Sequence, residues 1–152
     1  MAAKTSIDSS PRLRGQEVLI ELVVDGALSD AFTAVAAFSD SLKFAKSEDG
    51  FLGEPTNRHD FIYNGVDGSF EMHLQNSRWM TFQQVLKDIA QRNTPDTVIN
   101  IVRTDYYANG NTPTRTYQDV KFGGQPTAVS SRGDFVKVSF DFSCDDYNDQ
   151  LN

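Results

Sequence analysis

The chain has 152 residues, which suits one domain, and its hydrophobic content of 39%, with 11% aromatic residues, is enough to form a core. Its 14 basic and 21 acidic side chains give a formal net charge of −7, which disfavours general nucleic-acid binding because phosphates are contacted by Lys and Arg. The single cysteine excludes an intrachain disulfide, and no apolar run approaches the ~18 residues of a membrane span.

The two ends of the chain differ in composition from its middle. Residues 1–15 contain Ser, Pro and Gly, lack the apolar stretch of a signal peptide and are predicted to form a flexible N-terminal arm. Residues 144–152 are predicted to be a polar, acidic C-terminal tail. The remaining residues, 16–143, are expected to form one domain, and synthesis in the cytoplasm is expected.

The first half of this domain is predicted to contain a strand and a long loop. Apolar residues alternate over 18–24 and predict a strand that ends at the turn Asp25-Gly26. Residues 31–46 fit a helix by their alanines and a strand by their alternation, and periodicity does not separate the two. Residues 47–65 contain several Gly and Pro breakers and are predicted to form a long loop, functional or mobile.

One helix follows a clear strand. Apolar and polar residues alternate over 69–75, which predicts a half-buried strand. Thr81 and Gln84 have the spacing of a capping box, and the apolar residues over 82–90 fall on one helical face. Trp79, just before this helix, is expected to be a packing anchor.

The second half is predicted to be strands, at residues 98–107, 116–122 and 134–143, with a hairpin turn at Asn109-Gly110. Strands and a single helix in an order that is not βαβα predict a mainly β fold. We expect an antiparallel β-sandwich or barrel-like domain with one packed α-helix and a long protruding loop.

No constellation of residues predicts an enzyme. His59 and His73 are the only histidines, and no GxSxG motif presents a nucleophilic serine. Cys144 is flanked by Asp145 and Asp146, which should raise its pKa and disfavour a thiolate nucleophile, so a structural thiol is expected.

Metal and cofactor sites are not predicted either. The acidic residues near the C-terminus could in principle bind calcium, but they lack the glycine and terminal glutamate of an EF-hand loop, so a solvated acidic surface is expected. These residues are Asp141, Asp145, Asp146 and Asp149. Gly123-Gly124 is not followed by the Lys-Ser or Lys-Thr of a phosphate-binding loop.

The predicted loop carries apolar residues that a solvated loop does not need. Phe51, Leu52, Phe61, Ile62 and Tyr63 are mixed with charges, and burying one such side chain contributes about 1.5–3 kcal/mol. Two explanations stand side by side: contact with a second protein surface, or folding back on the same domain as an Ω-type lid.

The sequence of the same loop resembles a stretch of a known protein family. GFLGEPTNRHDFIYNGVDG at residues 50–68 resembles the GFLGE-x-T-x-R-x-D-x-IYNG stretch of bacteriophage tail tube proteins, especially those of contractile tails. The resemblance continues through INIVRTDYYANGNTPTRTY at 99–117 and DVKFGGQPTAVSSRGDFVKVSFDFS at 119–143, and covers roughly residues 16–143. Phe61 departs from it, because an acidic residue is expected after Asp60.

The resemblance implies a structural subunit of a virion tail, not an enzyme. Such subunits form hexameric rings that stack into a hollow tube inside a contractile sheath, and double-stranded DNA passes through the lumen during ejection. The implied partners are other copies of the chain, the tail sheath protein outside, the tape measure protein and then DNA inside, and baseplate and tail terminator proteins at the ends. Assembly is expected in the cytoplasm of a host bacterium, with no cofactor.

Two sets of site residues are expected in such a tube. Contacts between subunits or rings are expected at Phe51, Leu52, Gly53, Glu54, Arg58, Asp60, Ile62, Tyr63 and Gly65, with Arg58 and Asp60 in ion pairs across subunits. An acidic lumen wall is expected at Asp67, Ser69, Glu71, His73, Gln75, Ser139 and Asp141, where like charge would keep DNA from sticking. An ordinary solvent-facing surface is the alternative for the second set.

Three alternative functions stay open. The chain could belong to the tube of a non-contractile tail, or to a bacterial contractile injection machine such as a type VI secretion system. A monomeric β-sandwich binding module, for example for sugars, would instead show aromatic residues clustered on one open face. An enzyme is the third alternative, for which no constellation of residues is present.

Overall fold

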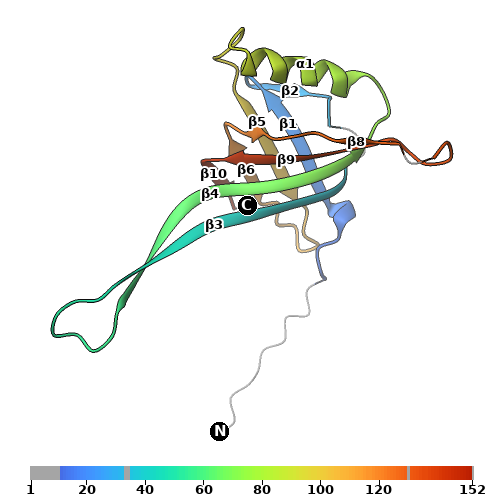
Figure 1. The fold of residues 1–152 in the computed structure, drawn as a ribbon. Coiled ribbons are helices and arrows are strands. Elements are labelled where there is room, and N and C mark those ends of the chain that lie inside the picture. The colour runs from blue at the N-terminus through green and yellow to red at the C-terminus, as the bar shows by residue number, and fades with distance from the viewer. Residues whose placement is uncertain (1–10, 33–34, 130, 152) are drawn as a thin grey trace.

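The structure of the chain, a computed structural model, describes residues 11–32, 35–129 and 131–151. These residues form two antiparallel five-stranded sheets, a short 3-10 helix η1 and one α-helix (Figure 1). The β1 sheet has the order β10-β6-β5-β1-β2, and the β4 sheet has the order β3-β4-β9-β7, with β8 also paired to β9. The elements are η1 Gly15–Glu17, β1 Val18–Val24, β2 Ala27–Ser29, β3 Val35–Asp49, β4 Arg58–His73, α1 Arg78–Ala90, β5 Ile99–Asp105, β6 Thr114–Gln118, β7 Lys121–Phe122, β8 Thr127–Ala128, β9 Lys137–Cys144 and β10 Asp146–Gln150.

The core lies between the two sheets because each sheet has one apolar face. Along β9, Val138, Phe140 and Phe142 are buried while the residues between them are exposed, as the alternation predicts. The other large buried side chains come from both sheets and from α1: Leu22, Val66, Phe70, Met72, Trp79, Phe82, Ile99, Ile101 and Tyr117. The predicted fold class is confirmed.

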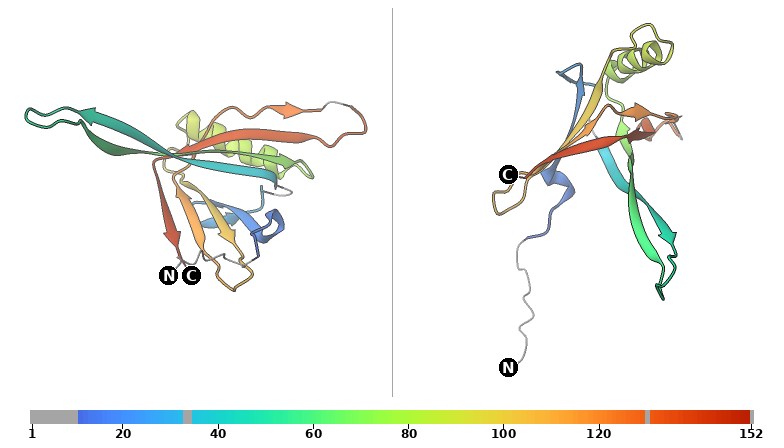
Figure 2. Two further views of the ribbon diagram at one scale, coloured as in Figure 1. Left: turned by 90° about the horizontal axis from the view of Figure 1, so that it is seen from below. Right: turned by 90° about the vertical axis from the view of Figure 1, so that its left-hand side faces the viewer.

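Helix α1 covers one end of the sandwich (Figures 1 and 2). Trp79 is buried in it, so the predicted packing anchor is confirmed. The predicted capping box is wrong, because the helix begins at Arg78 and Thr81 lies within it, with its hydroxyl donating to the Ser77 carbonyl. The side chain of Asn76 instead accepts a hydrogen bond from the Arg78 backbone N–H at 2.9 Å.

Strands β3 and β4 form one long hairpin in place of the loop predicted at residues 47–65. The described part of residues 31–46 contains no helix and belongs to β3 from Val35 onward. Only residues 50–57, here named the hairpin tip, lie between the strands. The register shifts between Leu42 and Phe44, next to Gly65 with φ +89°, where a Cβ would lie 2.5 Å from the Cys144 carbonyl oxygen. This bulge therefore requires glycine.

The acidic C-terminal segment is not a tail. Cys144 ends β9, and β10 pairs with β6, placing Tyr147 opposite Tyr117 and packing it against the core. Every residue of β10 except Tyr147 is polar, as an edge strand with one side in solvent allows, and this polarity conceals the strand in the sequence. Of the predicted arm, residues 1–10 lie outside the described residues, and η1 begins at Gly15.

Candidate assembly surfaces

The distal half of the β3–β4 hairpin extends away from the rest of the chain. In every view of Figures 1 and 2 it projects well beyond the sandwich, and Figure 1 shows α1 at the other end of the molecule. Leu52 at the hairpin tip is fully exposed and Phe51 is half exposed. The hairpin is therefore not an Ω-type lid folded on its own domain.

An uncovered aromatic strip runs along one face of this hairpin. Phe44 lies opposite Tyr63 in the register, and the centroid of its ring is 6.2 Å from that of Phe61 and 6.0 Å from that of Tyr63. Phe61 is 76% exposed and Phe44 58% exposed. We name Phe44, Phe61 and Tyr63 the aromatic strip. Phe61 was one of the apolar residues for which contact with a second protein surface was an open explanation, but neither Phe44 nor Phe61 was among the named contact residues. Side-chain alternation could be read only once the segment was known to be a hairpin.

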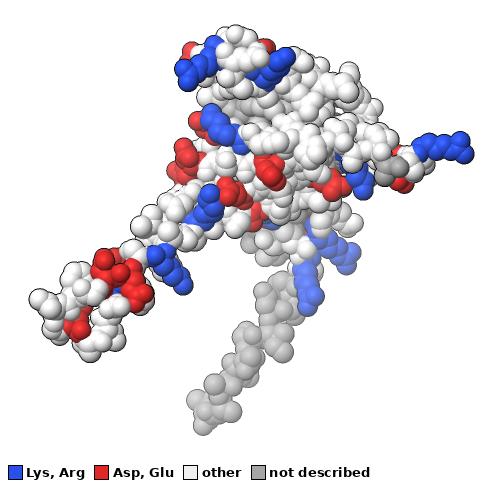
Figure 3. Space-filling model, viewed as in Figure 1, with Lys and Arg blue, Asp and Glu red and all other residues white. Residues whose placement is uncertain are grey.

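The charged residues of the hairpin pair within the same chain. Arg58 Nε donates to Glu54 Oε2 at 2.9 Å, and the guanidinium carbon lies 5.2 Å from the centroid of the Phe51 ring. The hydrogen bond to Glu54 raises the pKa of Arg58. Arg58 thus already has a partner, although an ion pair across subunits was predicted for it. Figure 3 shows acidic side chains gathered at the end of the hairpin.

The other predicted contact residues occupy three different places. Gly53 lies in the hairpin tip with φ +85°. Asp60 and Ile62 lie on the hairpin face opposite the aromatic strip, paired with Ser47 and Ala45 in the register. Gly65 lies against the backbone of its own chain, so its role in the structure is conformational.

The predicted lumen residues, except Gln75, share one face of the β4 sheet. The ladder places Ser69 opposite Asp141 and Glu71 opposite Ser139. Gln75 lies beyond the end of β4. We name this surface the polar face, formed by Ser39 and Ser41 of β3, Asp67, Ser69, Glu71 and His73 of β4, and Lys137, Ser139, Asp141 and Ser143 of β9.

Lysines offset the carboxylates of the polar face. Lys43 Nζ lies 3.0 Å from Asp67, and Lys137 Nζ lies 3.5 Å from Glu71. Lys121 of β7 lies opposite Ser143 and so projects on the same side. The expectation of an acidic wall considered the carboxylates alone, because only strand pairing shows which lysines lie beside them.

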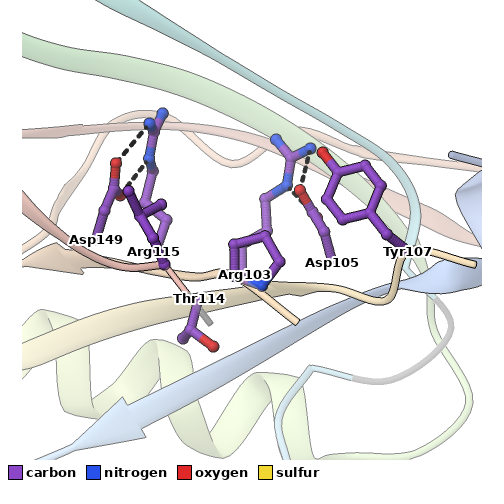
Figure 4. A pocket seen from close by; sticks show the side chains of 8 residues that line it. Arg103, Asp105, Tyr107, Thr114, Arg115 and Asp149 are labelled. Atoms are coloured by element: carbon purple, nitrogen blue, oxygen red, sulfur yellow. Dashed lines mark hydrogen bonds and ion pairs between the residues drawn. The ribbon is translucent and has the colours of Figure 1, made fainter. Parts of the chain in front are cut away.

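A cluster of arginines and carboxylates lies between the two sheets, and the sequence did not reveal it. Asp40 of β3 lies 3.8 Å from Arg103 Nη1 and 3.5 Å from Arg115 Nη1. Asp105 binds Arg103 at 2.9 Å and Asp149 binds Arg115 at 2.7 Å (Figure 4). These pairs line an open pocket of about 310 Å³. Because each of the two guanidiniums already faces carboxylates, we assign the cluster to holding the sheets together.

Tyr117 connects this cluster to the core. Its ring is fully buried, and its hydroxyl donates to Asp40. Burial and this hydrogen bond raise the pKa of Tyr117, because the phenolate would lie in a dry site beside a carboxylate. The hydrogen bond with Asp149 raises the pKa of Arg115. Tyr117 therefore stays neutral and Arg115 stays charged across the neutral range.

Other candidate chemistry is limited in the described parts of the chain. They contain no group of three or more potential metal-binding side chains. Their helices include none with the length and apolarity that crossing a bilayer requires. Cys144 is buried, and burial together with Asp145 and Asp146 raises the pKa of its thiol, as predicted.

Comparisons with known proteins connect this architecture to tail tubes. No family model and no curated protein matches the chain. A chain of the anti-feeding prophage baseplate aligns with a TM-score of 0.60 and 15% identity over 94% of this chain and 97% of that one. A chain of the PVC extracellular contractile injection system, from its extended sheath–tube complex, aligns with a TM-score of 0.60 and 9% identity over 88% of both. The SPP1 tail tube aligns with a TM-score of 0.58 and 13% identity over 93% of this chain and 80% of that one. The chain has the fold of these tube and injection-system subunits.

Proposed function

We propose that this chain is a structural subunit of a phage-type tail tube. One feature carries the proposal: the β4 sheet has an apolar inner face, a polar outer face and a hairpin whose aromatic strip continues beyond the domain. Exposed aromatic residues on a projection of this kind are typical of a surface that another protein covers. The shared fold with the SPP1 tail tube supports the same function.

Rings would form through the edges of the β4 sheet. Strand β3 is one edge, and β7 with β8 forms the other. Joining the first edge of one copy to the second edge of the next satisfies their unpaired backbone groups and closes a barrel. Six copies per ring is the number we propose, and the anti-feeding prophage baseplate was solved with sixfold symmetry. In this barrel the polar face lines the bore.

The bore would let double-stranded DNA pass because it holds phosphate weakly. On the polar face, Lys43 and Lys137 are each engaged by a carboxylate, so they are poor phosphate ligands. The predicted acidic lumen thus becomes a serine-rich wall with paired charges. Because Asp67 and Glu71 are paired with Lys43 and Lys137, such a wall would neither hold DNA tightly nor repel it strongly.

The assembled tube would lie in a tail made in the cytoplasm of a host bacterium. We propose a sheath around it, baseplate and terminator proteins at its ends, and a tape measure protein in the lumen before DNA. The match to a PVC sheath–tube complex supports the contractile form. The tube of an extracellular contractile injection system is the second candidate, because the PVC match comes from such a system.

Negative-stain microscopy of the purified chain over a range of concentrations tests the proposal. Rings or tubes with a central channel are the expected result, accompanied by large species in light scattering. A monodisperse monomer at every concentration would contradict it and favour a binding module.

A further inference from the structure

An apolar pocket lies between α1 and the strands beneath it, far from the hairpin. Leu86, Ile89 and Ala90 line it from the helix, and Val120 and Phe122 from the segment before and within β7. Its volume is about 340 Å³. A cavity of ~150 Å³ already accepts benzene, so this pocket has room for a large apolar side chain and part of a second.

The hairpin tip carries two side chains of matching chemistry. Phe51 and Leu52 are adjacent at the end of the projection, and their own chain leaves both exposed. The tip of one chain cannot reach its own pocket, because α1 and the hairpin tip lie at opposite ends of the molecule (Figure 1). Only a second copy could bring the two together.

The charges around the two surfaces have opposite signs. Lys87 of α1 and Lys121 of β7 are exposed at the margin of the pocket, although Lys121 Nζ also lies 2.9 Å from Asp119. Beside Phe51 and Leu52 the hairpin carries three carboxylates, Glu48, Asp49 and Glu54, and one guanidinium, Arg58. Figure 3 shows the acidic end of the hairpin, and around α1 it shows basic side chains with a few acidic ones among them. Complementary potentials of this kind steer encounter and fix orientation.

We propose that the pocket beside α1 receives the hairpin tip of another copy of this chain, with Phe51 and Leu52 inserted and Glu48, Asp49 and Glu54 beside Lys87 and Lys121. The inference rests on the proposed tube function and names the contact that joins its subunits. Tip and pocket are different surfaces, so each copy offers one of each. Such a heterologous contact repeats without limit unless its rotation closes a ring.

Disulfide trapping tests this contact in the full chain. A tagged Leu52→Cys chain is mixed with an untagged Ala90→Cys chain before assembly and oxidised with copper-phenanthroline. Cross-linked heterodimers are expected, while the wild-type chain should give none because Cys144 is buried. Met80→Cys is the matched control, since Met80 is 64% exposed at the other end of the same helix, and little cross-linking to it is expected.

A second variant fills the pocket without altering the tip. Ala90 is exposed at the last position of α1, so Ala90→Trp should fold and block insertion. The concentration required for assembly should then rise about tenfold or more, as expected for losing the burial of a large apolar side chain. Tubes that form without the 52–90 cross-link, or that tolerate Ala90→Trp, overturn the pocket assignment and leave the tube function standing. A wild-type chain that never self-associates overturns both.

Discussion

At the scale of single residues, Gly65 determines where the hairpin leaves the sandwich. It combines a φ of +89° with a backbone oxygen 2.5 Å from the place where a Cβ would lie. Gly65→Ala should therefore lower the free energy of unfolding by about 1–3 kcal/mol, measured by urea denaturation. Gly53→Ala is the control, because Gly53 has φ +85° but nothing within 4 Å of a Cβ. Equal losses in the two variants would show that backbone strain alone is responsible, without the clash.

Tyr117 gives the protein a predictable response to alkali. Its pKa is raised in the folded chain, by burial and by the hydrogen bond to Asp40, above the ordinary value of about 10. The unfolded chain therefore loses this proton first as pH rises. The stabilisation by neutral Tyr117 is complete below pH ~10 and declines above it by up to about 1.4 kcal/mol per pH unit.

Replacing Tyr117 by Phe should remove this contribution. Urea unfolding between about pH 9 and pH 11.5 should show a flatter decline for Tyr117→Phe than for the wild type. Tyr106→Phe, at a half-exposed position, should keep the wild-type slope. If Tyr117→Phe and the wild type declined in parallel, the titration of Tyr117 would not contribute to alkaline unfolding.

Individual side chains differ in how far the sequence determines them. Trp79 and Cys144 were assigned correctly, because a tryptophan beside an apolar helical face and a cysteine followed by two carboxylates each have local signals. Arg103 and Arg115 were not singled out. Their partner Asp40 lies on a strand of the other sheet, and nothing local in the sequence specifies which sheet faces which.

At the scale of elements, β10 shows how an edge strand escapes detection. Its sequence is polar at four of five positions, yet Tyr147 packs on the core and Asp149 binds Arg115. A chain ending at Asp145 should lose about 1–3 kcal/mol of unfolding free energy, since it loses both the partial burial of Tyr147 and the ion pair of Asp149 with Arg115. Thermal and urea unfolding measure it. A chain ending at Gln150 is the control and should keep wild-type stability, and equal stability of both truncations would rule out a structural role for β10.

The hairpin was predicted as a loop for a related reason. Glycine and proline in residues 50–57 mark the turn correctly, but the strands on either side carry charges that normally accompany loops. The long ladder between β3 and β4 overrides that composition, because cross-strand pairing depends on partners distant in the sequence. We expect exposed aromatic residues on such a ladder to have a consequence for assembly and little consequence for folding.

The double variant Phe44→Ser with Phe61→Ser should separate these two consequences, because these two side chains are the most exposed of the aromatic strip. Surface substitutions usually change stability by no more than about 0.5 kcal/mol, so the chain should still unfold cooperatively near the wild-type midpoint. Tubes and rings should be lost in light scattering and microscopy, because the aromatic strip would no longer bury apolar surface. Phe135→Ser, which removes a phenylalanine that is 75% exposed at the other end of the β4 sheet, is the control and should still assemble. Normal assembly of the double variant would exclude the strip from the interface.

At the scale of the whole molecule, the sequence predicted which residues of one strand share a face of the sheet, but not which residues of the neighbouring strands lie beside them. The alternation in β4 and β9 correctly divided apolar from polar residues, and the lumen candidates on these strands share one face. The lysines that offset the carboxylates come from β3, β7 and β9, and their positions depend on register. Composition already gives the net charge of the chain, but the charge of one surface can be predicted only when the pairing of the strands is known.

Reversing charge on the polar face tests its position in the assembled tube. Asp67→Lys with Glu71→Lys adds lysines beside Lys43 and Lys137, which lose their carboxylate partners. Tubes assembled with a short fluorescent duplex should then retain it in a nuclease-resistant form at low salt and release it near ~0.2 M salt, as counterion competition requires. The variant Asp67→Asn with Glu71→Gln removes the carboxylates without adding cations, so tubes of this variant should retain less of the duplex. Retained duplex that nuclease still digests would place this face on the outside of the tube, and no retention at any salt concentration would remove it from the path of DNA.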